Sequence, residues 1–179
     1  MSWLRAKVNL PFARDRFESL LSGAEAGIAT TAAIVVGLAV TTNSSGIVLL
    51  SAGITLFIQA FNAAGGRYSS LRTSQEISGS ENFQLHTRLF TSFIQLVSHL
   101  ATSMLVIIPV ARYGTSTRGI WTTLLLSTLL LTLVAIYKNI YIRKHVFQDT
   151  IELILVGVLV MLVGLNAGLT LELILQLRA

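Results

Sequence analysis

The sequence has 179 residues, of which 53% are hydrophobic and only 12% are charged, with a formal net charge of +5. Ordinary soluble domains carry about 25% charged residues, so a water-exposed surface is hard to build from this composition, which predicts one integral membrane domain. The basic residues lie between long apolar runs, so we interpret them as markers of membrane topology and expect no nucleic-acid partner.

Residues 1–21 mix basic side chains with aromatic and leucine side chains before the first long apolar run. Pro11 favours a helix start, because a proline at the first helical position loses no hydrogen bond. Beyond it, Phe17, Leu20 and Leu21 share one broad face, which predicts an N-terminal amphipathic helix on the bilayer surface. A frayed, solvated tail is the alternative for this segment.

Five apolar runs follow, and each is long enough to cross roughly 30 Å of hydrocarbon as a helix. They lack the period-two alternation of strands, so we predict an all-α integral membrane protein with five transmembrane helices. The turn after the first run is short and polar, so the second span should return antiparallel beside the first. The predicted spans are residues 22–42, 46–66, 89–111, 119–137 and 150–177.

The distribution of basic residues predicts the orientation of the chain. Of the 13 Lys and Arg residues, ten fall in the N-terminal segment, the loop between spans two and three, and the loop between spans four and five. The other three fall in the loop between spans three and four and at the C-terminus. Because basic loops stay in the cytoplasm, we expect a cytoplasmic N-terminus and a C-terminus outside or in a lumen.

Three short motifs stand out in this frame. GAEAGIATT at 23–31 opens the first span, and NAAGGRYSS at 62–70 closes the second. The third, LILVG at 153–157, follows a basic loop and an acidic residue. Together they resemble the vacuolar iron transporter family, over about residues 20–170.

This resemblance implies a five-span fold and a homodimer. It also implies that the protein moves ferrous or other divalent ions out of the cytosol against protons, along a path between first spans. Eukaryotic members of that family insert a long metal-collecting segment between spans two and three. Residues 69–88 are too few to form such a segment.

The motifs depart from the family pattern at the positions that bind metal. Ala26 stands where the family has an Asp, with Glu25 one place earlier, while Ala63 replaces a Met and Arg67 replaces a Glu. One residue is about 100° of helix, so Glu25 need not face the direction of the family's Asp. A guanidinium about 6 Å from a divalent ion opposes it by on the order of 5 kcal/mol at an effective dielectric near 20.

Glu25 opens the first span and Arg67 closes the second, so both should lie at the cytoplasmic face of neighbouring helices. We predict that they form an ion pair at the place of the family's metal entrance, with Glu25 as the candidate metal ligand. The alternative is that each charge faces the lipid headgroups.

Polar side chains inside the spans are candidates for lining a cation path. Gln59 and Asn62 should form one stripe with Thr55 that faces protein, either as oxygen donors or as interhelical hydrogen-bond glue. His99 lies one helical turn after Gln95 in the third span. It is either a proton relay or metal ligand on the path or, as we favour, a hydrogen-bonded structural residue.

Two functions compete on this basis. The first is a divalent metal (iron or manganese) transporter of the vacuolar iron transporter type, with the lipid bilayer and a second copy as partners. The GxxxG pairs at 23–27 and 164–168 permit the close helix approach that such a dimer needs. The second is a transport-dead relative that serves as an accessory subunit of a larger membrane complex. No residue cluster is typical of an enzyme, so we expect no catalytic activity and no resident cofactor.

Overall fold

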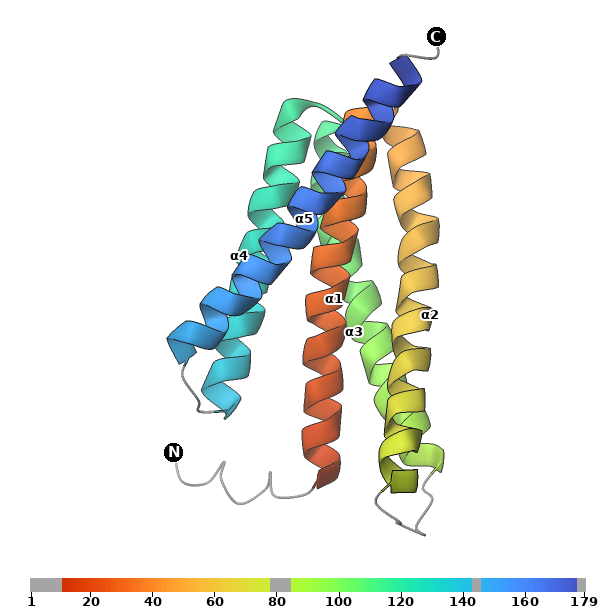
Figure 1. Cartoon of the computed structure of the whole chain (residues 1–179), viewed down its shortest axis with the longest axis vertical. Helices are drawn as coiled ribbons and strands as arrows, with labels where there is room; N and C mark the ends of the chain where they lie inside the picture. Colours follow the sequence, from red (N-terminus) through yellow and green to blue (C-terminus); the bar gives the residue numbers. More distant parts are fainter. Residues whose placement is uncertain (1–10, 78–84, 143–145, 177–179) are drawn as a thin grey trace.

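The computed structural model describes residues 11–77, 85–142 and 146–176, and this part of the chain is built from helices. The helices run alternately up and down the long axis, so α1 begins and α5 ends at opposite ends of the bundle (Figure 1). All five are long and apolar enough to cross a membrane, which makes this a multi-pass integral membrane protein, as predicted. The helices are α1 (Pro11–Thr41), α2 (Ser45–Ile77), α3 (Leu85–Tyr113), α4 (Thr117–Ile142) and α5 (Val146–Gln176).

The helices extend beyond the predicted spans, mainly at the end of the bundle where α1 begins. Helix α2 continues past residue 66 to Ile77, and α1 begins at Pro11, where the sequence predicts a helix start. Residues 11–21 form the first turns of α1 and not a separate surface helix. The rest of that predicted amphipathic segment, residues 1–10, lies outside the described residues. We refer below to this end of the bundle as the charged end.

At the opposite end of the bundle, short turns are closed by serine and glycine. Ser44 Oγ accepts a backbone N–H from the first turn of α2 at 3.4 Å, and Ser116 Oγ accepts one from α4 at 3.3 Å. A serine in this position satisfies an amide that the helix itself leaves unbonded. Gly114 follows α3 with a φ of 66°, and its N–H donates to the Val110 carbonyl at 2.9 Å. Glycine adopts this left-handed conformation without a steric penalty.

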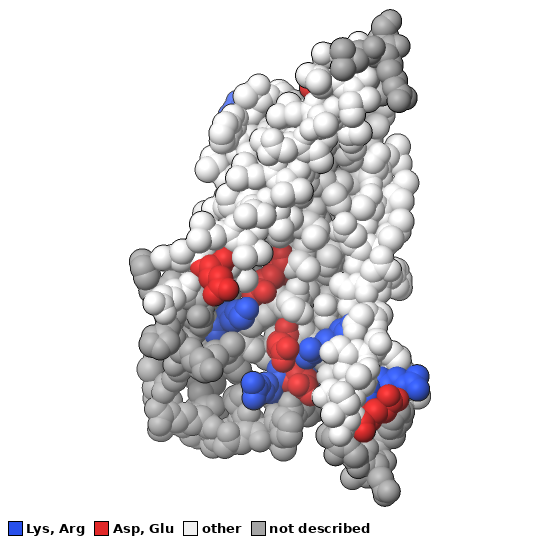
Figure 2. Space-filling model, in the orientation of Figure 1, with Lys and Arg blue, Asp and Glu red and all other residues white. Residues whose placement is uncertain are grey.

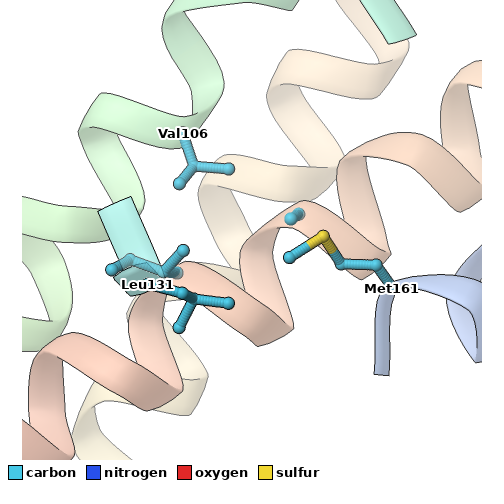
Figure 3. Packing of buried hydrophobic residues seen from close by; sticks show 5 residues of the cluster. Val106, Leu131 and Met161 are labelled. Carbon is cyan, nitrogen blue, oxygen red and sulfur yellow. The ribbon is translucent and has the colours of Figure 1, made fainter. Parts of the chain in front are cut away.

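Helix α1 is the centre of the bundle: it packs on all four other helices and is the most buried of the five. Helix α2, in contrast, contacts only α1 and α3 within the described residues. Figure 3 shows Val106, Leu131 and Met161, from α3, α4 and α5, converging beside α1. One core cluster consists of Ile28, Ala32, Val106, Leu131 and Met161, and a second of Val35, Val48, Ala52 and Val110.

Glycines allow α1 to approach α3 and α5 at backbone distance. A Cβ added to Gly23 would lie 2.6 Å from the Gln95 carbonyl oxygen, and one on Gly27 would lie equally close to another α3 carbonyl. A Cβ on Gly37 would lie 2.6 Å from the carbonyl oxygen of Gly164 on α5. Both GxxxG pairs therefore serve helix packing within one chain. They are not needed to explain a dimer contact, which is the role that the sequence suggested for them.

The outward faces of α2, α4 and α5 carry large apolar side chains. On the face shown in Figure 2, the charged residues gather mostly in the lower part, at the charged end. An apolar surface of this extent is costly in water, and in a bilayer it faces acyl chains. Exposed examples are Phe57, Phe61, Leu125, Leu155 and Leu159.

Candidate functional site

Glu25, the candidate metal ligand, is paired with a lysine from another helix. Lys138 Nζ donates to Glu25 Oε1 at 3.0 Å and so joins the end of α4 to α1. The side chain of Glu25 is 20% exposed and that of Lys138 is 37% exposed. The carboxylate is therefore largely withdrawn from the surface and holds a cation supplied by the chain itself.

Arg67 is bound to the first turns of α1 by three contacts. Its Nε donates to Ser19 Oγ at 2.7 Å, its Nη1 lies 3.3 Å from Glu18 Oε1, and its Nη2 donates to the Asp15 carbonyl at 3.3 Å. Only 15% of the Arg67 side chain is exposed, whereas Glu18 is 59% exposed. The arginine thus fastens the end of α2 to the start of α1.

The predicted ion pair between Glu25 and Arg67 is wrong, because each residue has a different partner. The reason is the register of the two antiparallel helices. Both helices extend farther at the charged end than the predicted spans, and Arg67 lies level with Glu18 and Ser19. These residues precede Glu25 by six or seven positions, about 10 Å of helix. Lys138 was counted in the sequence only as a topology marker, although its position just past the fourth span could have indicated such a pairing.

The predicted stripe on α2 does not face protein along its whole length. The buried face of α2 consists of Val48, Ala52, Leu56, Ala60 and Ala64. Gln59 is half-buried, about 100° away from Ala60, and Asn62 is exposed on nearly the opposite side. Thr55 Oγ1 donates to its own helix, to the Ser51 carbonyl at 2.7 Å. Asn62 is therefore not placed on a protein-lined path.

Gln59 and Thr55 instead border a groove between α1, α2 and α5. The groove has a volume of about 510 Å³, and its lining is mostly apolar, including Ala33 and Gly37 of α1. It is open on one side, along the outward surface where α2 and α5 do not touch. Its shape and apolar lining suit an acyl chain or the helix of another copy better than a hydrated ion.

Hydroxyl groups on α3 bind the backbone of α1 along the glycine contact. Ser98 Oγ donates to the Leu20 carbonyl at 2.6 Å, and Ser103 Oγ donates to the Gly27 carbonyl at 3.2 Å. Thr31 Oγ1 on α1 donates in return to Ser103 Oγ at 2.8 Å. Small residues and interhelical hydroxyl bonds are the typical means of joining helices in a membrane.

A second set of polar residues on α3 is buried without such bonds. We name it the inner row; it consists of Thr91 and its neighbour Ser92, followed by Gln95 and His99 at intervals of three and four residues. His99 is 1% exposed, and within the described chain neither of its ring nitrogens has a hydrogen-bond partner. The same holds for the two hydroxyls and for Gln95 Oε1. The structure thus gives His99 no hydrogen-bonded structural role with a protein partner, which is the role that we favoured from the sequence.

The inner row lowers the stability of the fold if its polar groups have no hydrogen-bond partner. An unsatisfied buried polar group costs about 1–3 kcal/mol, and the row holds several. The sequence contains the signal for this face, because Arg88, Ser92, Gln95, His99 and Ser103 repeat at helical spacing.

Among the described residues, no group of three or more His, Cys, Asp or Glu side chains is gathered as a metal site. Comparisons with protein-family models and with curated proteins gave no match for this chain. The fold defines the class: a multi-pass membrane protein whose described residues form five helices, with a partly buried ion pair between Glu25 of α1 and Lys138 of α4.

Proposed function

We propose that this protein moves a divalent cation across a membrane, in the manner of the vacuolar iron transporters that its motifs resemble. Glu25 is the proposed cation-binding carboxylate. The observation that carries this proposal is the pair of Glu25 with Lys138, 3.0 Å apart and largely withdrawn from the surface. Ionisable residues inside membrane helices are costly, and those that persist usually serve a transported ion or a proton.

In this proposal Lys138 is a tethered cation that holds the site between transport events. A divalent ion about 6 Å from a lysine ammonium is opposed by on the order of 5 kcal/mol at an effective dielectric near 20. The lysine must therefore leave Glu25 before the ion binds. Its flexible stem and its 37% exposure leave it room to swing away. The carboxylate then alternates between a lysine-bound and an ion-bound state.

The proposed route runs beside α1 within one chain. Helix α1 packs on all four other helices of its own chain and is open along the groove, so most of its surface is available to a route within one chain and not between two copies. The predicted homodimer stays part of the proposal. The second copy would pack on the outward side of α2 and α5, where the groove lies.

Uptake of Mn²⁺ into proteoliposomes with a pH gradient tests the proposal. We expect wild-type flux above that of empty vesicles, and at least a tenfold loss in Glu25→Gln. Glu76→Gln is the matched control, because Glu76 also pairs with a basic residue, Arg72, but at an exposed position. Wild-type flux equal to that of empty vesicles would remove the transport proposal.

A second candidate is an accessory subunit without transport activity. It is favoured by the basic partners of two acids on α1, Lys138 on Glu25 and Arg67 on Glu18. Each of these carboxylates is neutralised by its basic partner, whereas sites that bind a divalent cation usually carry a net negative charge. A protein that shows no flux but requires a defined partner chain to remain folded in detergent would support this candidate.

A further inference from the structure

We propose that the inner row lines a narrow water-filled passage from the charged end of the bundle to His99, and that His99 is a proton-binding site. The inference goes beyond the proposed function, because the passage lies along α3 and would carry protons whether or not Glu25 carries a metal. It rests on the unpaired, buried atoms of Thr91, Ser92, Gln95 and His99.

The row has the length and position of a half-channel. It begins one turn beyond Arg88, whose guanidinium lies over the Tyr68 ring of α2 at 5.2 Å. The proposed passage, from Arg88 to His99, covers eleven residues, about 16 Å of helix, or roughly half of the hydrocarbon thickness. Beyond His99, Ser103 is bonded to α1, and Val106 and Val110 are fully buried. The polar row therefore ends in closely packed apolar core.

The chemistry of the row suits water and protons. Two hydroxyls, an amide oxygen and an imidazole offer both donors and acceptors, as a chain of bridging waters requires. Imidazole accepts a proton at one ring nitrogen to become imidazolium, and it returns the proton to the same chain of water. The row itself contains no carboxylate, the usual ligand of a hard metal cation.

Glu25 and Arg67, on the two helices beside the row, are engaged elsewhere, whereas Arg16 of α1 lies over the Phe90 ring of α3 at 4.5 Å, next to the start of the row. On α1, Glu25 is turned to Lys138 of α4, and on α2, Arg67 is bound to α1. Tyr68 of α2 lies under Arg88 at the start of the passage. Neither ion pair includes His99.

Silver ions test the passage directly, because the chain contains no cysteine and each variant then carries one thiol. Ag⁺ is close in size to water, reacts with thiols and does not partition into hydrocarbon. In proteoliposomes, we expect the Ser92→Cys thiol to be blocked by Ag⁺ at least tenfold faster than the Ser127→Cys thiol. Ser127 is the matched control: it is also a buried serine, but its hydroxyl donates to its own helix at 2.7 Å. Equal rates for the two thiols, in variants that elute as the wild type does, would overturn the proposal.

The histidine itself is tested by nitrogen NMR of ¹⁵N-histidine-labelled protein in bilayers. The signals lost in His99→Gln identify His99. We expect them to change from neutral to imidazolium positions between about pH 8 and pH 4.5, a range that brackets the ordinary histidine pKa. Signals that stay constant over this range would overturn the proton site. Neither measurement uses metal flux, so failure of the transport proposal leaves both results interpretable.

Discussion

Lys138 Nζ lies 3.0 Å from Glu25 Oε1, so the last turns of α4 are tied to the middle of α1 by a charge pair inside the bundle. This relationship links the stability of the fold to the proposed transport site. The carboxylate is held in place by the same amine that must leave before a cation binds. Any change in this pair should therefore appear both in stability and in ion binding.

We predict a measurable coupling between the two residues. In a double-mutant cycle with Glu25→Gln and Lys138→Met, the coupling should be about 1 kcal/mol, near the upper end for exposed pairs and below the value for fully buried ones. Equilibrium unfolding in mixed detergent micelles measures it. The pair of Arg72 and Glu76 on the exposed part of α2 is the control and should give a smaller coupling. A coupling of zero for Glu25 and Lys138 would contradict the role of this pair as a tie.

Lys138→Met alone should strengthen cation binding at Glu25, because it removes the competing ammonium while it leaves the carboxylate in place. The expected direction is a lower dissociation constant for Mn²⁺, measured by isothermal titration in detergent. The double variant with Glu25→Gln should bind no more tightly than Glu25→Gln. Unchanged Mn²⁺ affinity in Lys138→Met would show that Glu25 is not the binding carboxylate.

Arg67 should act as a structural fastener and not as a blocked metal entrance. Arg67→Met removes three contacts to α1 and should cost about 1–3 kcal/mol of unfolding free energy. Arg67→Glu should cost more, because it places a carboxylate beside Glu18. The charge reversal Glu18→Arg with Arg67→Glu should recover part of the loss in the same unfolding assay. If Arg67→Glu alone were as stable as the wild type and raised Mn²⁺ uptake, the fastener interpretation would fail.

The glycines of α1 should be sensitive to a single methyl group. Gly23→Ala would bring a Cβ to 2.6 Å from the Gln95 carbonyl oxygen, and Gly37→Ala would do the same at Gly164. Each should destabilise by about 1–3 kcal/mol, the usual cost of overpacking. Gly53→Ala on α2 is the control: no atom lies within 4 Å of its added Cβ, so helix propensity should make it neutral or slightly stabilising. Thermal unfolding in detergent distinguishes these outcomes.

The sequence was sufficient for the fold, because span length and hydropathy are properties of each helix by itself. The position of Pro11 and the five apolar runs predicted where helices lie, although not that α1 and α2 continue past the bilayer-spanning length at the charged end. The pairing of side chains between helices could not be predicted in this way. It depends on the register and rotation of one helix against another, so Glu25 was assigned to Arg67 when its partner is Lys138. For the same reason Asn62 was placed on a protein-facing stripe although it is exposed.

The excess of basic residues at the charged end predicts that this end is cytoplasmic. In whole cells, a membrane-impermeant thiol reagent should label Ser116→Cys, in the exposed turn between α3 and α4. It should label Ser74→Cys, exposed near the end of α2, only after the cells are permeabilised. The cysteine-free wild type is the blank, and the opposite pattern of labelling would reverse the assigned orientation.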